Sequence, residues 1–187
     1  SQSSIKTVAD LVAYAKANPG KLSFASAGNG TTTHLSIVLL SREAGIDVTH
    51  VPYRSGGQTV ADVLGGQVDA VFSDISALAP HVQSGKLTAL AVTAPQRSPL
   101  IPNVPTMAEA GLPGVRTINW FGLHAPAGTP SAVLERLKTA VRAAQLDSAY
   151  QASLARIAMT TGTVGAESFA EMIQEEAQSL APIVRSL

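Results

Sequence analysis

The sequence predicts an α/β fold built on a parallel sheet, and three observations support this. Short apolar segments alternate with amphipathic segments between residues 7 and 92, as in chains whose strands and helices alternate. The apolar segments are nearly continuous, which is typical of parallel strands that helices cover on both faces. Beyond residue 130, only helical periodicity remains. We therefore expect a parallel-rich sheet followed by a separate group of helices.

The first elements are expected to be a helix, a strand, a helix and a strand, at residues 7–17, 21–27, 32–44 and 48–53. Apolar residues repeat at helical spacing in the first and third of these segments. Gly45 follows the second helix at the position that favours a left-handed C-cap. The end of the second helix is therefore predicted from a local residue.

The same alternation continues after a second Gly-rich loop at residues 54–57. A helix ends before Gly65, a strand covers residues 70–73, a helix covers residues 76–83, and an apolar strand covers residues 87–92. Four strands that alternate with helices predict a parallel sheet.

The second half of the chain has a different pattern. Residues 95–113 contain five prolines, so we expect an irregular segment with one helical turn at residues 106–110. A strand is predicted at residues 120–126, and helices at residues 131–144, 148–157 and 166–184. These helices have no sheet of their own, so their apolar faces must cover another part of a larger fold.

Composition narrows the classes of function. The chain has 187 residues, of which 45% are hydrophobic, so it can bury a substantial core. Thirteen Lys and Arg residues balance thirteen Asp and Glu residues without charged blocks, and this argues against nucleic acid or an anionic membrane as a partner. The chain has no cysteine, and no apolar run is long enough to span a bilayer. We expect a soluble protein or a soluble piece of one.

A loop of small residues is the main candidate for a binding site. It lies between a predicted strand and a predicted helix and has the sequence Ser26-Ala27-Gly28-Asn29-Gly30-Thr31-Thr32. Small side chains expose backbone N–H groups, and the first N–H groups of a helix have no internal partners, so such a loop attracts carboxylate or phosphate. The alternative is an ordinary, well-capped turn, and the residues alone leave both interpretations open.

Further candidates lie close to this loop or at other strand ends. His34 falls in the first turn of the helix, where it either bonds nearby backbone or touches a ligand. Tyr53, Arg54, Ser73 and Asp74 follow two other strands, at the sheet edge where open α/β folds bind ligands. Arg54 could hold a carboxylate or be an ordinary arginine exposed to solvent, and the residues leave both interpretations open. Asp74 could bind an amine or order water, but capping of the following helix is the favoured interpretation.

No catalytic residues, metal site or cofactor are expected. The sequence lacks a Gly-x-Ser-x-Gly motif and the spacing of a nucleotide P-loop. No histidine and carboxylate are placed to activate a serine, and the four histidines form no i, i+4 pair. Binding is therefore favoured over catalysis.

Five motifs in order, at residues 22–35, 50–54, 64–69, 104–111 and 120–130, resemble the Bug-type solute receptors of tripartite tricarboxylate transporters. The resemblance covers essentially the whole chain. It implies a type II periplasmic-binding-protein fold, whose two α/β lobes close on a dicarboxylate, tricarboxylate, amino acid or aromatic acid. It also implies a periplasmic location, membrane permease subunits as partners and no enzyme activity.

The resemblance further implies that the chain is a fragment. Residues 5–118 correspond to the second, ligand-binding lobe, and residues 119–187 to a hinge strand and the C-terminal helices of an incomplete first lobe. The opposing ligand loop is then missing, and exposed apolar faces are expected to cause self-association. Ser55 departs from the family's usual glycine, and the last helix lacks the family's frequent tryptophan. A ligand-sensing module of a regulatory system is the alternative function, because the same fold serves such proteins.

Overall fold

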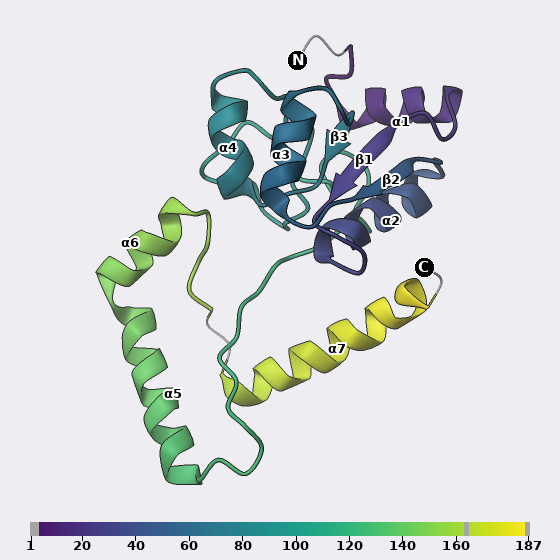
Figure 1. Cartoon of the computed structure of the whole chain (residues 1–187). Coiled ribbons are helices and arrows are strands. Elements are labelled where there is room, and N and C mark those ends of the chain that lie inside the picture. Colours follow the sequence, from purple (N-terminus) through teal and green to yellow (C-terminus); the bar gives the residue numbers. More distant parts are fainter. Residues whose placement is uncertain (1–3, 163–164, 186–187) are drawn as a thin grey trace. The chain divides into compact units, whose positions relative to one another are not determined.

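The computed structural model describes residues 4–162 and 165–185. The chain forms two compact units, Ser1–Asn119 and Trp120–Leu187 (Figure 1). Among the described residues, the first unit contains a sheet and four helices, and the second contains three helices.

Three parallel strands form the sheet of the first unit. They are β1 (Ser23–Ser26), β2 (Thr49–Pro52) and β3 (Ala70–Val71). β1 lies in the middle, in the order β2-β1-β3, and its Phe24 is in register with His50 of β2 and Ala70 of β3. The expected parallel α/β architecture is therefore confirmed.

Four helices accompany the sheet, namely α1 (Val8–Ala17), α2 (Thr32–Ala44), α3 (Gly56–Leu64) and α4 (Ile75–Gln83). Thr7 and Asp10 form a reciprocal capping box at the start of α1, in which each side chain accepts from the other residue's backbone N–H. α2 ends at Gly45, whose φ of 61° confirms the predicted left-handed C-cap.

The hydrophobic core lies between the sheet and the helices of the first unit. Its main cluster of buried residues is Val8, Leu11, Ala15, Leu22, Phe24, Ile37, Leu40, Ala44, Ile46, Met107 and Val115. A second cluster joins α4 to the irregular segment through Ala79, Val92, Ile101 and Val104. The core thus fixes the strands and helices whose ends form the candidate site.

The strand expected at residues 87–92 is absent from the structure. Only Val92 pairs, through an isolated parallel bridge in which its N–H donates to Pro105 O at 2.9 Å and its carbonyl accepts from Met107 N at 2.8 Å. Pro105 has no N–H, so the facing segment cannot extend a regular ladder. The strand prediction was therefore wrong at this position.

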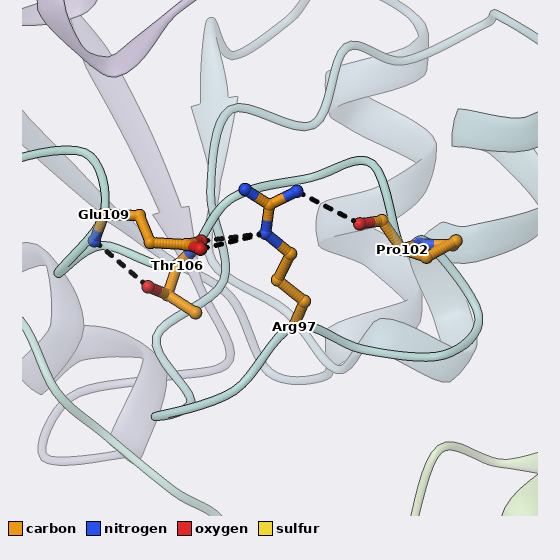
Figure 2. A network of polar contacts seen from close by, with 4 residues as sticks. All are labelled: Arg97, Pro102, Thr106 and Glu109. Carbon is orange, nitrogen blue, oxygen red and sulfur yellow. Dashed lines mark hydrogen bonds and ion pairs between the residues drawn. The ribbon is translucent and has the colours of Figure 1, made fainter.

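Polar side chains organise the proline-rich segment that follows (Figure 2). Arg97 Nε donates to both carboxylate oxygens of Glu109, at 3.1 and 2.9 Å, and Arg97 Nη1 donates to Pro102 O at 3.3 Å. Glu109 also accepts from Thr106 N at 2.7 Å, and Thr106 Oγ1 accepts from Glu109 N at 3.1 Å. This reciprocal pair is a capping box around the single turn expected at residues 106–110.

The second unit consists of α5 (Ser131–Leu146), α6 (Ser148–Arg156) and α7 (Ala166–Val184). Trp120 contacts Phe169 of α7 edge to face, with ring centroids 5.1 Å apart, and its Nε1 donates to Glu176 Oε2 at 2.6 Å. α5 and α6 contain no buried residue. In the described part of the chain, no helix is both long and apolar enough to cross a membrane.

The predicted hinge strand at residues 120–126 is a second correction. These residues have no strand assignment, and none of the described residues of the second unit forms a strand that could pair with them. A strand requires a neighbour for its backbone N–H and C=O groups, so apolar residues alone do not produce one.

Candidate functional site

Three helices begin close to the ends of the three strands. β1 leads to α2, β2 leads to α3, and β3 leads to α4. Because the strands are parallel, their carboxyl ends lie at one edge of the sheet, where open α/β folds bind ligands. The helix N-termini bring partial positive charge and unpaired N–H groups to the same edge. This edge is the candidate anion site.

Glycines shape the loop between β1 and α2. Gly28 has a φ of 130° and Gly30 a φ of 74°, values that side chains disfavour. A Cβ on Gly28 would lie 3.3 Å from Tyr53 O, because the loop passes close to the end of β2. Tyr53 N donates to Ser26 O at 2.9 Å and continues the pairing of the two strands. The loop therefore requires glycine at its closest approach to β2.

Threonine hydroxyls hold the loop against the start of α2. Thr31 is the N-cap, and its Oγ1 accepts from His34 N at 3.3 Å and donates to Gly28 O at 2.7 Å. Thr33 Oγ1 accepts from Ala27 N at 3.0 Å and lies 2.9 Å from Thr31 Oγ1. The loop is thus a well-capped turn, which leaves its remaining N–H groups available for binding.

Two histidines and a buried serine contact the loop or each other. Gly30 N donates to His34 Nδ1 at 3.1 Å, which shows the backbone contact considered for His34. The His34 and His50 rings stack with centroids 4.0 Å apart and planes 9° from parallel. His50 Nε2 lies 2.6 Å from Ser26 Oγ, which accepts from Gly28 N at 3.2 Å. Burial lowers the pKa of His34, and burial followed by the neighbouring His34 lowers the pKa of His50.

Several backbone donors at this edge remain unpaired. Among the residues that the structure describes, the N–H groups of Asn29, Thr32 and Thr33 have no hydrogen-bond partner. The N-cap residues of the other two helices, Ser55 and Asp74, make no side-chain cap hydrogen bond. An anion at the strand ends could therefore accept from all three helix N-termini without displacing a side-chain cap from α3 or α4.

The predicted side chains at the other strand ends have different surroundings. Tyr53 Oη donates to Asp62 Oδ2 at 2.7 Å, and this bond raises the pKa of Tyr53. Arg54 is exposed. A Cβ on Gly56 would lie 3.9 Å from Ser73 Oγ, so Ser73 lies beside the start of α3. Of these residues, Arg54 is the one that brings a positive charge to the strand ends.

The structure corrects the favoured interpretation of Asp74. Asp74 occupies the N-cap position of α4, but its side chain makes no cap hydrogen bond. Asn119 Nδ2 donates to Asp74 Oδ1 at 2.9 Å and directs this carboxylate to the segment that leaves the first unit. The contact spans 45 positions, which local sequence patterns do not reveal.

Sequence reasoning missed three residues of the network, namely Thr33, His50 and Asn119. A signal existed for His50, because residues two apart on a strand share a face. Parallel pairing of the first two predicted strands in the observed register brings His50 opposite Phe24, two residues before Ser26. No comparable signal existed for Asn119. Among the described residues, no group of three or more His, Cys, Asp or Glu side chains could hold a metal ion.

Solved structures reproduce this fold. A structure described as that of a periplasmic transporter is 34% identical, with a TM-score of 0.89 over 98% of this chain and 61% of that chain. A Rhodopseudomonas palustris protein solved with adipate is 29% identical, with a TM-score of 0.87 over 98% and 62% of the two chains. MatC from the same species, solved with bound malate, is 30% identical, with a TM-score of 0.83 over 98% and 63%.

Sequence comparisons agree with the structural ones. A protein encoded in the tcbD-tcbE intergenic region of Pseudomonas sp. strain P51 is 37% identical over 177 residues, which are 94% of this chain and 53% of the relative. BugT of Bordetella pertussis is 34% identical over 175 residues, or 94% and 54% of the two chains. The chain thus spans about half the length of these relatives. The profile of the tripartite tricarboxylate transporter family receptors, TctC, matches residues 1–187, and the chain belongs to this family of solute-binding receptors.

Proposed function

We propose that this chain is the ligand-binding part of a periplasmic receptor for a small organic carboxylate. The receptor passes its ligand to the membrane permease subunits of a tripartite tricarboxylate-type transporter. The observation that carries the proposal is the meeting of three helix N-termini, with unpaired N–H groups, at one sheet edge. The adipate and malate bound to two similar proteins support a dicarboxylate, and tricarboxylates, amino acids and aromatic acids share the same carboxylate chemistry.

One carboxylate of the ligand accepts from the N–H groups of Asn29, Thr32 and Thr33 in this proposal. Arg54 supplies the positive charge, and the helix dipoles add to it. Ser26 has 0% exposure, so it acts by positioning the loop rather than by direct contact. The hydroxyl of Ser73 and the carboxylate of Asp74 both lie at the end of β3, which neighbours β1, and select the rest of the ligand.

The two units have different roles in the complete receptor. The first unit forms one lobe, and the helices of the second unit belong to the opposing lobe. The exposed apolar side chains of the second unit, including Phe121 and Leu123 before α5 and Leu146 at its end, are covered in that lobe. Closure of the lobes on the ligand shifts a population of open and closed forms, and the closed form is the one that reaches the permease.

A nuclear magnetic resonance titration of the 187-residue chain with malate and adipate tests the proposal. Backbone signals of residues 29–33 should shift at millimolar ligand, whereas the uncharged diamide of adipic acid should leave them unchanged. Arg54→Gln should weaken binding about tenfold, because a charge-assisted hydrogen bond is lost. Lys21→Gln is the matched control, since Lys21 is also an exposed cation but precedes β1 at the opposite edge. Shifts that are equal for the acid and the diamide, or equal losses in both variants, would reject the anion site.

The exposed apolar side chains of the second unit have a separate consequence. We expect the isolated chain to self-associate through them, because apolar patches left uncovered favour association. Sedimentation velocity at increasing protein concentration measures this directly. Phe121→Ser with Leu123→Ser should reduce the association, whereas a monomer at all concentrations would contradict the expectation.

A further inference from the structure

Two loop positions depend on the pair of histidine rings. His34 accepts from Gly30 N at 3.1 Å, and His50 contacts Ser26 Oγ at 2.6 Å, which in turn accepts from Gly28 N at 3.2 Å. The rings stack at 4.0 Å, so they join the start of the loop to its middle. We propose that His34 and His50 are positioning residues that hold the ligand loop in its binding form only while both rings are uncharged. This inference rests on the function proposed for the loop.

The hydrogen bond to Gly30 sets the charge state of His34. An N–H group can donate to Nδ1 only if that nitrogen carries a lone pair, so His34 is neutral, with its proton on Nε2. Protonation would place an N–H group at Nδ1, facing the N–H of Gly30. Two donors repel, and the Gly30 peptide would have to turn away. Its neighbour Asn29 supplies one of the unpaired N–H groups of the candidate site, so the site changes with it.

The His50 ring makes the stacked pair sensitive to charge on both rings. Two charged imidazoliums with centroids 4.0 Å apart would repel each other in a partly buried environment. His34 is buried and His50 is half-buried, so water screens the repulsion only in part. Ser26 Oγ also donates to Gly28 O at 3.3 Å, and its hydroxyl can accept from His50 Nε2 as well as donate to it, so a charge on His50 alone does not break this contact. Repulsion between two charged rings would move them apart, and this would disturb the Gly30 contact of His34 together with the Ser26 contact of His50.

Among the described residues, no carboxylate or cation outside the pair is a cause of the pKa shift of either ring. Arg54, which follows β2 at this edge, is exposed. β1, which packs against both α2 and β2, carries no titratable side chain. On α2, Arg42 and Glu43 lie at least two turns beyond His34, toward the C-terminal end. On α3, Asp62 accepts from Tyr53 Oη, and Arg116 is exposed on the later segment. The pKa of each ring is accordingly lowered by burial, with the charge of His34 as a further cause for His50.

Falling pH is expected to weaken the loop. The pKa of each ring lies below the ordinary value of about 6.5, so both rings are neutral at neutral pH. In the unfolded chain the rings take up protons at higher pH than in the folded chain. The folded loop is therefore fully stabilised above about pH 6.5 and loses stability as the pH falls through the lowered values.

A ligand-free titration of the 187-residue chain by nuclear magnetic resonance tests the coupling directly. Between pH 7.5 and 5, the Gly30 amide signal should move together with the ring nitrogens of His34. His34→Asn should abolish the movement, because the Asn Oδ1 accepts from Gly30 N near the former Nδ1 position but does not titrate. A Gly30 signal that stays constant while His34 titrates would overturn the proposal.

Affinity for malate supplies the functional readout. Between pH 7.5 and 5.5, the wild-type affinity should fall about fivefold to tenfold more than that of His34→Asn with His50→Gln, a loss equivalent to one or two hydrogen bonds. Malate takes up protons equally in both experiments, so the ratio of the two falls in affinity reports only the change in the protein. His81→Gln, which replaces a histidine on α4, should retain the wild-type fall. Equal falls in wild type and double variant would refute a positioning role. If malate does not bind at any pH, the proposed function fails, and the ligand-free titration still decides whether the rings control the loop.

Discussion

The two units of the chain contain similar helices with different surroundings. α2 buries Leu35, Ile37 and Leu40, whereas α5 buries none of its residues, although both helices are amphipathic. All the buried residues of the described chain belong to the first unit. An apolar face therefore predicts a helix in both units but a core only where the chain supplies a sheet to cover it.

The second unit relies on few contacts. Trp120 packs on Phe169 and bonds Glu176, and Gln145 Nε2 donates to Gly162 O at 2.8 Å. α6 has only 9 residues, and isolated helices shorter than about 12–15 residues are marginal in water. The candidate site thus lies on the unit that has its own core.

Amide hydrogen exchange should show the largest difference between the units. We expect Phe24 and Ala25 of β1 to exchange on the order of 10³-fold more slowly than the central residues of α5, a difference of about 4 kcal/mol in opening free energy. The physical reason is that β1 opens only when the core of the first unit unfolds, whereas α5 opens locally. The measurement is mass spectrometry or nuclear magnetic resonance at dilute protein concentration.

Self-association is the main alternative cause of protection in α5. A dilution series separates the two causes of slow exchange. Protection that arises from association falls as the protein is diluted, whereas protection that arises from folding does not. Protection of α5 equal to that of β1 at the lowest concentration would show that the second unit folds cooperatively with the first.

Substitution of one leucine in each unit should give the next largest difference. Leu40 is 1% exposed in the core of the first unit, and Leu137 is 39% exposed on α5. Leu40→Ala should lower the free energy of unfolding by about 2–5 kcal/mol, whereas Leu137→Ala should lower it by less than about 1 kcal/mol. Denaturant unfolding followed by far-ultraviolet circular dichroism measures the free energy of unfolding of both variants. A large loss for Leu137→Ala would mean that α5 packs in solution.

The success of sequence reasoning for the fold depended on how local each signal was. The bounds predicted for α2 and α7 agree with the structure, because caps and breakers such as Gly45 act within one turn. The strands predicted at residues 87–92 and 120–126 failed because a strand depends on a partner distant in sequence. Apolar residues indicated burial for Val92, but they could not show that its bridge partner would be Thr106, directly after a proline that has no N–H.

The same distinction applies to the candidate site. The Gly-rich loop and the Thr31 cap were predictable, because glycine and threonine favour these conformations locally. The contact of Ser26 with His50 spans 24 positions, and it depends on the register between β1 and β2. Prediction of such a side-chain network requires the tertiary structure, whereas prediction of the loop itself does not.

Helix caps offer a finer test of the two units. Thr7 Oγ1 accepts from Asp10 N at 3.0 Å at the start of α1, and Asp147 Oδ1 accepts from Tyr150 N at 2.8 Å at the start of α6. Thr7→Ala should lower the global free energy of unfolding by about 1 kcal/mol. Asp147→Ala should leave the global transition unchanged and reduce only the helical signal. Thr7→Ser serves as the control, because serine restores the cap, and equal effects of the two alanine variants would remove the distinction.

Two ion pairs, one in each unit, should show the smallest difference. Arg97 and Glu109 lie 2.9 Å apart and are held by the capping box with Thr106, whereas Lys138 and Glu135 form an isolated i, i+3 pair on α5 at 2.8 Å. All four side chains are substantially exposed, so water and salt screen both attractions. The capping box reduces the entropy that Glu109 loses on pairing, and Arg97 donates to both of its carboxylate oxygens. Double-mutant cycles with Arg97→Gln and Glu109→Gln should therefore give a small coupling free energy, and cycles on the α5 pair a smaller one. Coupling of equal size in both pairs would show that the ordered surroundings of the first unit add nothing to an exposed ion pair.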